Sequence, residues 1–283
     1  MLTEKKWDWE IGTKSGWIWN FSHLYNYRHL LGNLVKKEFL LNYQQTILGP
    51  LWILFQPLLT LVTYLLVFNK LIGIPVGSNL PPVLFYFSGI VLWSFFNDSF
   101  SGTAGTFINN IHIFSKVYFP RIIMPVALII NQFLRLCIQL LLLTLLIIYY
   151  TLFQNLHLEF SLMTLGVPVA FVFVGLLSLS IGLIFSVLTA KYRDIGNFVA
   201  VAIRLLMFIT PVIYPLSAIK KELHWIVNLN PLAPLFELFR LGLFGTGIVS
   251  FPQFLYSALF TLITLVLALY LFQKEGSKLI DVV

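Results

Sequence analysis

Six long runs of apolar residues follow one another along most of the chain. A hydrocarbon core about 30 Å thick needs roughly 20 residues of α-helix to cross it. Runs of this kind occupy residues 48–70, 83–105, 123–150, 163–188, 198–214 and 254–272. We therefore expect an all-α integral membrane protein, in which residues 46–273 form a domain of six transmembrane helices.

Apolar residues at spacings of three and four, beside basic residues, precede the first run at residues 21–43. This pattern predicts an amphipathic helix that lies in the membrane interface within an N-terminal segment, residues 1–45. The first 20 residues are rich in tryptophan, which is typical of headgroup-level anchoring. They contain no apolar core of signal-peptide length, so we expect no cleavable signal.

A second irregular stretch lies between the fifth and sixth runs. Its pattern predicts two short amphipathic helices at residues 216–228 and 232–243, hinged at Asn230 and Pro231. We expect this pair to lie on the outer side and to resemble a re-entrant segment, because irregular backbone survives in a membrane only against protein or water.

Lysine and arginine are distributed unevenly between the two sides that the six runs define. One side receives the N-terminal segment, the loops 106–122 and 189–197, and the tail 274–283, and it carries most of these residues. The other side holds only Lys70, Lys220, Lys221 and Arg240. Because basic loops stay in the cytoplasm, we expect both termini to be cytoplasmic.

The composition agrees with a membrane protein, since 59% of the residues are hydrophobic and 10% are charged. Soluble proteins have roughly a quarter of their residues charged. The net charge of +7 is explained by the loop asymmetry, and no basic stripe with interleaved aromatic residues indicates nucleic-acid binding. The single cysteine, Cys137, lies in an apolar run and excludes a disulfide within the chain.

Motifs of enzyme chemistry are absent from the sequence. No G-x-x-x-x-G-K-[ST] segment is present to hold ATP phosphates, and the five histidines have no metal-binding spacing. No close pair of carboxylates lies in an apolar run. We therefore expect no catalytic residue, no metal and no cofactor in this chain.

Three ionisable residues interrupt the apolar runs: Asp98, Arg135 and Arg204. Their depths are similar, and an unpaired charge in a membrane is costly. One hypothesis is that Asp98 forms an ion pair with one of the two arginines. The alternative is a polar patch along a substrate path.

Aromatic residues make up 16% of the chain. One interpretation is bulk that faces lipid and belts at the interfaces. The other is a passage whose rings stack on the faces of sugars and let a polymer slide. The candidates for such a lining are Trp52, Phe55, Tyr64, Phe68, Trp93, Phe208 and Tyr214.

Four segments, in order, resemble the ABC-2 type permeases of the polysaccharide-export subfamily, which moves O-antigen, capsule or teichoic acid chains. They are residues 42–57 (NYQQTILGPLWILFQP), 116–125 (KVYFPRIIMP), 191–197 with 210–215 (KYRDIGN and TPVIYP), and 230–234 (NPLAP) with Glu237 and Arg240.

The resemblance implies a homodimer with two copies of a separate ATPase subunit, which binds the ATP and Mg²⁺ and explains the missing phosphate loop. The substrate would be a polysaccharide on an undecaprenyl diphosphate carrier in the bacterial inner membrane. A coupling helix that contacts the ATPase would include Asn109, Asn110, Ile111, His112, Ile113, Phe114, Ser115, Lys116, Val117 and Tyr118. The substrate entrance would include Arg28, Lys36, Lys37, Tyr43, Gln45, Thr46, Leu48, Gly49, Pro50 and Trp52.

Two alternatives stay open at this point. One is an ABC-2 permease for a drug or a simple lipid. The other is a membrane-embedded glycosyltransferase or acyltransferase, which would need an acid–base group that the sequence does not show. The sequence does not distinguish O-antigen from teichoic acid or capsule.

Overall fold

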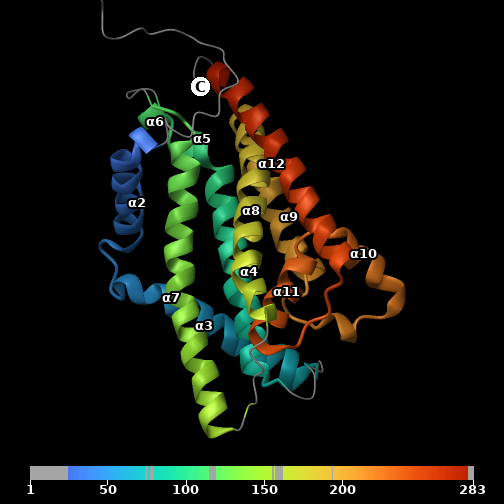
Figure 1. The fold of residues 1–283 in the computed structure, drawn as a ribbon. Helices are drawn as coiled ribbons and strands as arrows, with labels where there is room; N and C mark the ends of the chain where they lie inside the picture. The colour runs from blue at the N-terminus through green and yellow to red at the C-terminus, as the bar shows by residue number, and fades with distance from the viewer. Residues whose placement is uncertain are drawn as a thin grey trace, which may run out of the picture.

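A computed structural model describes residues 25–73, 76, 80–114, 119–154, 156, 162–192 and 194–279. Every regular element within these ranges is helical, as expected (Figure 1). Five helical segments in the described part are long and apolar enough to cross a membrane. They are Gly49–Leu71 (with α3, Trp52–Tyr64), α4 (Pro82–Ala104), α7 (Ile123–Phe153), Met163–Lys191 (with α8, Gly166–Lys191) and Phe251–Glu275 of α12 (Phe251–Leu279).

The fifth apolar run forms a shorter helix than the sequence predicts. Helix α9 covers Ile195–Ile209, 15 residues, and the chain then leaves helical geometry at Thr210. At 1.5 Å per residue this helix is about 22 Å long, less than the thickness of a hydrocarbon core. The predicted span at 198–214 is therefore wrong at its C-terminal end, where Pro211 interrupts the helical hydrogen bonds.

Helix α2 (Arg28–Tyr43) runs alongside the first half of α7 (Figure 1). Its Leu34 is buried in a cluster with Ile123 and Met124 of α7. Helix α7 has 31 residues and is about 46 Å long, so part of it extends beyond a 30 Å core. The amphipathic helix exists, but its apolar side packs on α7; its position at a membrane surface stays a prediction.

The centre of the molecule is formed by α4 and α8, which pack closely along their length (Figure 1). The close approach needs glycine, because a Cβ atom on Gly182 would lie 2.6 Å from the Cβ atom of Thr103. The helices differ in how much of their most apolar stretch is buried inside the protein. In α4, 72% of that stretch is buried, whereas the value is 17% for the first span and for α7. The first span and α7 therefore present apolar faces that lipid or another chain must cover.

Only part of the first predicted outer helix is formed. Two 3-10 turns precede α10 (His224–Leu229), whereas α11 (Ala233–Phe244) agrees with the second. Helix α11 is almost completely buried and packs against α8. It ends at Gly245, whose positive φ of 68° suits a glycine helix cap.

At the other end of α4, the chain forms α5 (Thr106–Asn109) and α6 (Ile111–Phe114) in place of one helix. Asn110 separates the two and donates a hydrogen bond to the Thr106 carbonyl at 3.0 Å. Of the predicted coupling helix, residues 115–118 lie outside the described part. The last predicted span continues as helix α12 to Leu279, so the described part of the predicted tail is helical.

Candidate functional site

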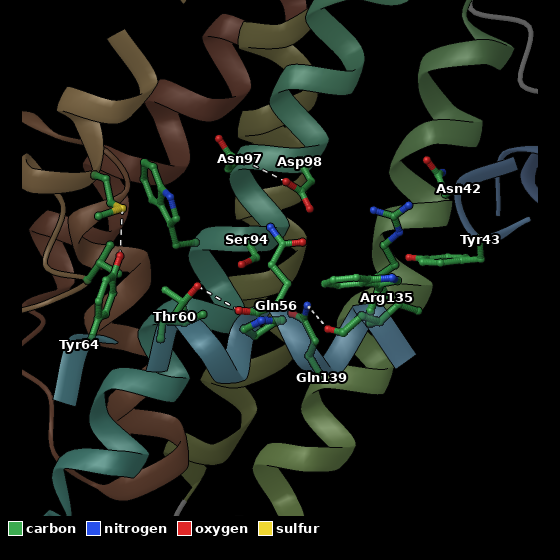
Figure 2. Close-up of a pocket in the computed structure, with 17 residues that line it drawn as sticks. Asn42, Tyr43, Gln56, Thr60, Tyr64, Ser94, Asn97, Asp98, Arg135 and Gln139 are labelled. Carbon is green, nitrogen blue, oxygen red and sulfur yellow. Dashed lines mark hydrogen bonds between the residues drawn. The ribbon is translucent and has the colours of Figure 1, made fainter. Parts of the chain in front are cut away.

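A polar cavity of about 430 Å³ lies between the C-terminal end of α2 and helices α3, α4 and α7. Figure 2 shows polar side chains that point into it from several elements. Its lining combines amides, a carboxylate, a guanidinium and aromatic rings. The lining residues are Asn42, Tyr43, Trp52, Ile53, Gln56, Pro57, Thr60, Tyr64, Ile90, Trp93, Ser94, Asn97, Asp98, Arg135, Gln139, Met207 and Val212.

Pro57 explains how α7 is joined to α3 at this cavity. Proline has no N–H, so the carbonyl of Ile53, four residues earlier in α3, loses its helical donor. The side-chain amide of Gln139 on α7 donates to that carbonyl at 3.3 Å. A buried carbonyl is thereby satisfied, and Gln139 lies at the wall of the cavity.

Two opposite charges face the same cavity without forming an ion pair. Asp98 Oδ1 accepts a hydrogen bond from Asn97 Nδ2 at 2.9 Å (Figure 2). The guanidinium carbon of Arg135 lies 5.3 Å from the centroid of the Tyr43 ring. Glu237 and Arg240 form an ion pair elsewhere in the described part of the chain, whereas Asp98 lies within ion-pair distance of neither Arg135 nor Arg204. The predicted pairing of Asp98 with Arg135 or Arg204 is therefore not formed within the chain.

Arg204 lies elsewhere, on an exposed face of α9. The same face carries Phe198, Val201 and Phe208, which are all more than half exposed. A positive charge on such an apolar face is costly against lipid. This face of α9 therefore needs water or another polypeptide over Arg204.

The Tyr43 hydroxyl belongs to the cavity wall at the end of α2. Burial raises the pKa of this phenol above its usual value, while the nearby Arg135 opposes the shift. At neutral pH Tyr43 is therefore an uncharged hydroxyl that can donate a hydrogen bond into the cavity.

The cavity brings together six of the residues that the sequence singled out. They are Tyr43 and Trp52 of the predicted entrance, Tyr64 and Trp93 of the predicted lining, and the charges Asp98 and Arg135. These residues come from α2, α3, α4 and α7, so the cavity joins positions between residues 43 and 135.

The other candidates do not line the cavity. Arg28, Lys36 and Lys37 are exposed on α2, and Gln45, Thr46, Leu48, Gly49 and Pro50 form the connection from α2 to α3. Phe55 and Phe208 are exposed on α3 and α9, at 42% and 57%. Phe68 packs edge-on against Tyr64, and the Tyr214 hydroxyl donates to the Phe208 carbonyl.

Of the predicted coupling residues, Phe114 and Asn110 point inward, whereas Asn109 and His112 are exposed. Ile111 and Ile113 are half-buried. Ser115, Lys116, Val117 and Tyr118 lie outside the described residues.

Sequence reasoning missed the amide and hydroxyl residues of the lining. Two of them had a weak signal in the sequence that could have indicated a position in the lining. Gln56 precedes the helix-interrupting Pro57, and Gln139 lies one helical turn after Arg135, on the same face. Missed as lining residues were Asn42, Gln56, Thr60, Ser94, Asn97 and Gln139.

A second polar cluster was also missed, because Arg240 was assigned to an amphipathic helix on the outer side and not to a buried position. Arg240 is 1% exposed, and its two Nη atoms donate to the carbonyls of Pro211 at 2.6 Å and Val212 at 2.9 Å. Its guanidinium lies 3.8 Å from the centroid of the Phe85 ring and also pairs with Glu237. These bonds join α11 to the irregular chain after α9.

Glycine makes room for this cluster. A Cβ atom on Gly89 would lie 2.5 Å from the Val212 carbonyl oxygen and 3.0 Å from Arg240 Nη2. Glu237 completes the arrangement by accepting a hydrogen bond from the Ile248 N–H at 3.0 Å. The cluster thus satisfies backbone groups that no regular helix would satisfy.

Comparison with known proteins shows which family this chain matches. Residues 29–244 match the ABC-2 type transporter family. The match contains the cavity, the Glu237–Arg240 cluster and the described part of the predicted coupling segment.

Three curated relatives are each named O-antigen export system permease protein RfbA. One from Klebsiella pneumoniae is 27% identical over 235 residues, which cover 82% of this chain and 85% of the relative. A second from the same species is 25% identical over 257 residues, which cover 90% of this chain and 94% of the relative. One from Myxococcus xanthus is 27% identical over 220 residues, covering 77% and 81%.

Proposed function

Because the chain belongs to the ABC-2 type transporter family, we propose that it is the permease subunit of an exporter for lipid-linked polysaccharide. The substrate is an O-antigen-like glycan on undecaprenyl diphosphate, and it crosses the bacterial inner membrane. The observation that carries this proposal is the similarity to three O-antigen export permeases over 77–90% of the chain. A cavity lined by both aromatic and polar side chains supports a sugar substrate.

ATP hydrolysis takes place in a separate subunit. The sequence contains no phosphate-binding loop, so ATP and Mg²⁺ bind to the partner and not to this chain. The α5–α6 segment is the proposed contact, because Ile108 is 48% exposed there while Phe114 anchors the segment in a buried cluster. A movement of the ATPase would reach α7, α8 and α12 through this buried cluster.

Two copies of the chain form the transport path. The exposed faces of α3 and α9 carry Phe55 and Phe208 as proposed lining, together with Arg204. A water-containing passage between two copies would cover these faces and solvate Arg204, which lipid would not.

Entry takes place from the cytoplasmic side, where both termini lie. The exposed Arg28, Lys36 and Lys37 of α2 attract the carrier diphosphate toward Tyr43 and the connection to α3. Tyr43 then borders both the basic helix and the cavity.

Co-purification with the ABC ATPase encoded beside this chain tests the proposal. We expect a complex of two permease and two ATPase chains whose ATP hydrolysis rises at least about threefold with lipid-linked glycan. The variant Ile108→Glu places a charge on the proposed contact and should abolish co-purification. The control Lys220→Glu, which lies beyond the far end of α9, should leave it unchanged.

A well-folded chain that binds no ABC ATPase would contradict the proposal. Stimulation by simple lipids or drugs, with none by the glycan, would favour an ABC-2 permease of another specificity.

A further inference from the structure

We propose that the cavity beside Asp98 is a subsite for one uncharged, hydroxyl-rich sugar unit, contained within a single copy of the chain. This inference rests on the proposed function, since it assumes a glycan substrate. It goes further by assigning sugar recognition to each protomer separately, apart from the lipid carrier and from any passage between two copies.

Unused hydrogen-bonding capacity in the cavity is the first argument. Asp98 receives only the bond from Asn97 among the described residues, although a carboxylate accepts several. The buried Nε atom of Arg135 has no hydrogen-bond partner in the described part. Gln56 points from α3 toward Asp98 with no side-chain hydrogen bond to another described residue (Figure 2). Buried polar groups are normally satisfied, so the Arg135 Nε atom awaits a ligand or water. Asp98 is partly buried and Gln56 is exposed, so both are accessible to the same ligand.

The aromatic residues supply the second argument. Trp52 on α3 and Trp93 on α4 both line the cavity, and so do the hydroxyl-bearing rings of Tyr43 and Tyr64. Flat rings bind the C–H faces of a pyranose, while amides and carboxylates bind its hydroxyl edge. The volume of about 430 Å³ lies within the range of small-ligand sites.

The charge balance distinguishes a sugar from the carrier diphosphate. Arg135 alone would attract a phosphate, but Asp98 faces the same cavity and would repel it. Sugar hydroxyls can accept hydrogen bonds from the Arg135 guanidinium and donate hydrogen bonds to the Asp98 carboxylate, so a sugar can bind to both charged groups. The geometry therefore favours a neutral sugar unit over a diphosphate.

Binding of a lipid-free oligosaccharide to the full-length chain, purified in nanodiscs, tests this subsite. The probe is the oligosaccharide that mild acid releases from the polysaccharide of the strain that encodes the chain. We expect saturable quenching of tryptophan fluorescence with one oligosaccharide per chain. Inorganic pyrophosphate should not displace it.

Three variants give the binding measurement its specificity. Asp98→Asn and Trp93→Phe should each weaken binding about tenfold or more, since the first removes a hydrogen-bonding charge and the second replaces the indole by a smaller ring without an N–H donor. Trp225→Phe is the matched control, because Trp225 is 63% exposed on α10 and lies outside the cavity. It should leave the dissociation constant unchanged.

Several outcomes would overturn the subsite. They are no saturable binding by a folded chain, equal affinity in Asp98→Asn and Trp93→Phe, displacement by pyrophosphate, or one oligosaccharide per two chains. If ATP-dependent export also continued at the normal rate in both variants, the subsite would be wrong while the exporter proposal would stand. Loss of ATPase association in a chain that still binds the oligosaccharide would contradict the exporter proposal and leave the subsite standing.

Discussion

Two regions of this molecule place charged side chains among apolar helices, and they treat them in opposite ways. At Arg240, both Nη atoms donate to carbonyls, a carboxylate pairs with the guanidinium, and an aromatic ring covers it. At Asp98 and Arg135, the charges share a cavity of about 430 Å³ without an ion pair. A charged side chain whose hydrogen bonds are all made within the protein stabilises the fold, whereas one with unused hydrogen-bonding capacity can bind a ligand.

The largest effect on stability is expected at Arg240. The substitution Arg240→Ala removes the ion-pair partner of Glu237 and the donors to two carbonyls, and it should lower the free energy of unfolding by about 3–5 kcal/mol. Thermal unfolding in detergent measures this loss. The control Arg204→Ala removes an exposed arginine and should change stability by less than about 0.5 kcal/mol.

A smaller loss of stability is expected at Asn230, which joins the hinge of the α10–α11 pair to the end of α9. Its side-chain Nδ2 donates a hydrogen bond to Thr210 Oγ1 at 2.8 Å, and its side-chain Oδ1 accepts one from the Leu232 N–H at 3.0 Å. Asn230→Ala should cost about 1–3 kcal/mol, since it leaves buried groups unpaired. A loss of the size expected at Arg240 would show that this hinge supports α11 as much as the arginine does.

Asp98→Asn should reverse the pattern, with little effect on stability and a large effect on transport. The amide keeps the shape of the side chain, and no ion pair is broken, so unfolding should change by less than about 1 kcal/mol. Export of lipid-linked glycan should fall at least about tenfold because sugar hydroxyls lose a charged acceptor. If the variant were strongly destabilised but its remaining folded fraction exported glycan at the normal rate, Asp98 would have a structural role instead.

Arg135→Lys is expected to have the smallest effect and to refine the contrast. Lysine keeps the positive charge but loses the planar group that lies over Tyr43, and it loses the Nε donor. Export should fall by about three- to tenfold, with thermal stability within about 1 kcal/mol of the wild type. Export rates in whole cells, normalised to protein level, measure the difference, and a loss equal to that of Asp98→Asn would mean that planarity matters as much as charge.

Much of the fold was predictable because hydrophobic length is a direct signal in a membrane protein. The helical class, the positions of α4, α7 and α8, and the segment of α11 followed from apolar runs and punctuation by proline and glycine. The early end of α9 was not predictable from apolarity, because residues 211–214 are apolar although they are not helical. The carbonyls of Pro211 and Val212 accept hydrogen bonds from Arg240, which lies 28 residues further along the chain than Val212.

The candidate site was predictable only in part. Charges and aromatic rings stand out in an apolar sequence, so Asp98, Arg135, Trp52 and Trp93 were found. Amides and hydroxyls such as Ser94 are common in helices, and their convergence depends on packing between distant segments. Of the two hypotheses for Asp98, the ion pair with an arginine is not formed among the described residues, because similar depth alone does not place two side chains within bonding distance.

Transport by the reconstituted permease–ATPase complex tests the central claim most directly. Vesicles that contain the complex would receive lipid-linked glycan on the ATPase side, and appearance of the glycan on the opposite side would be measured with ATP and with a non-hydrolysable analogue. The account predicts ATP-dependent transport by the wild type and by Arg204→Lys, and a loss of at least about tenfold in Asp98→Asn, as expected when a charged hydrogen bond to substrate is removed. Absence of glycan transport by a complex that hydrolyses ATP would contradict it.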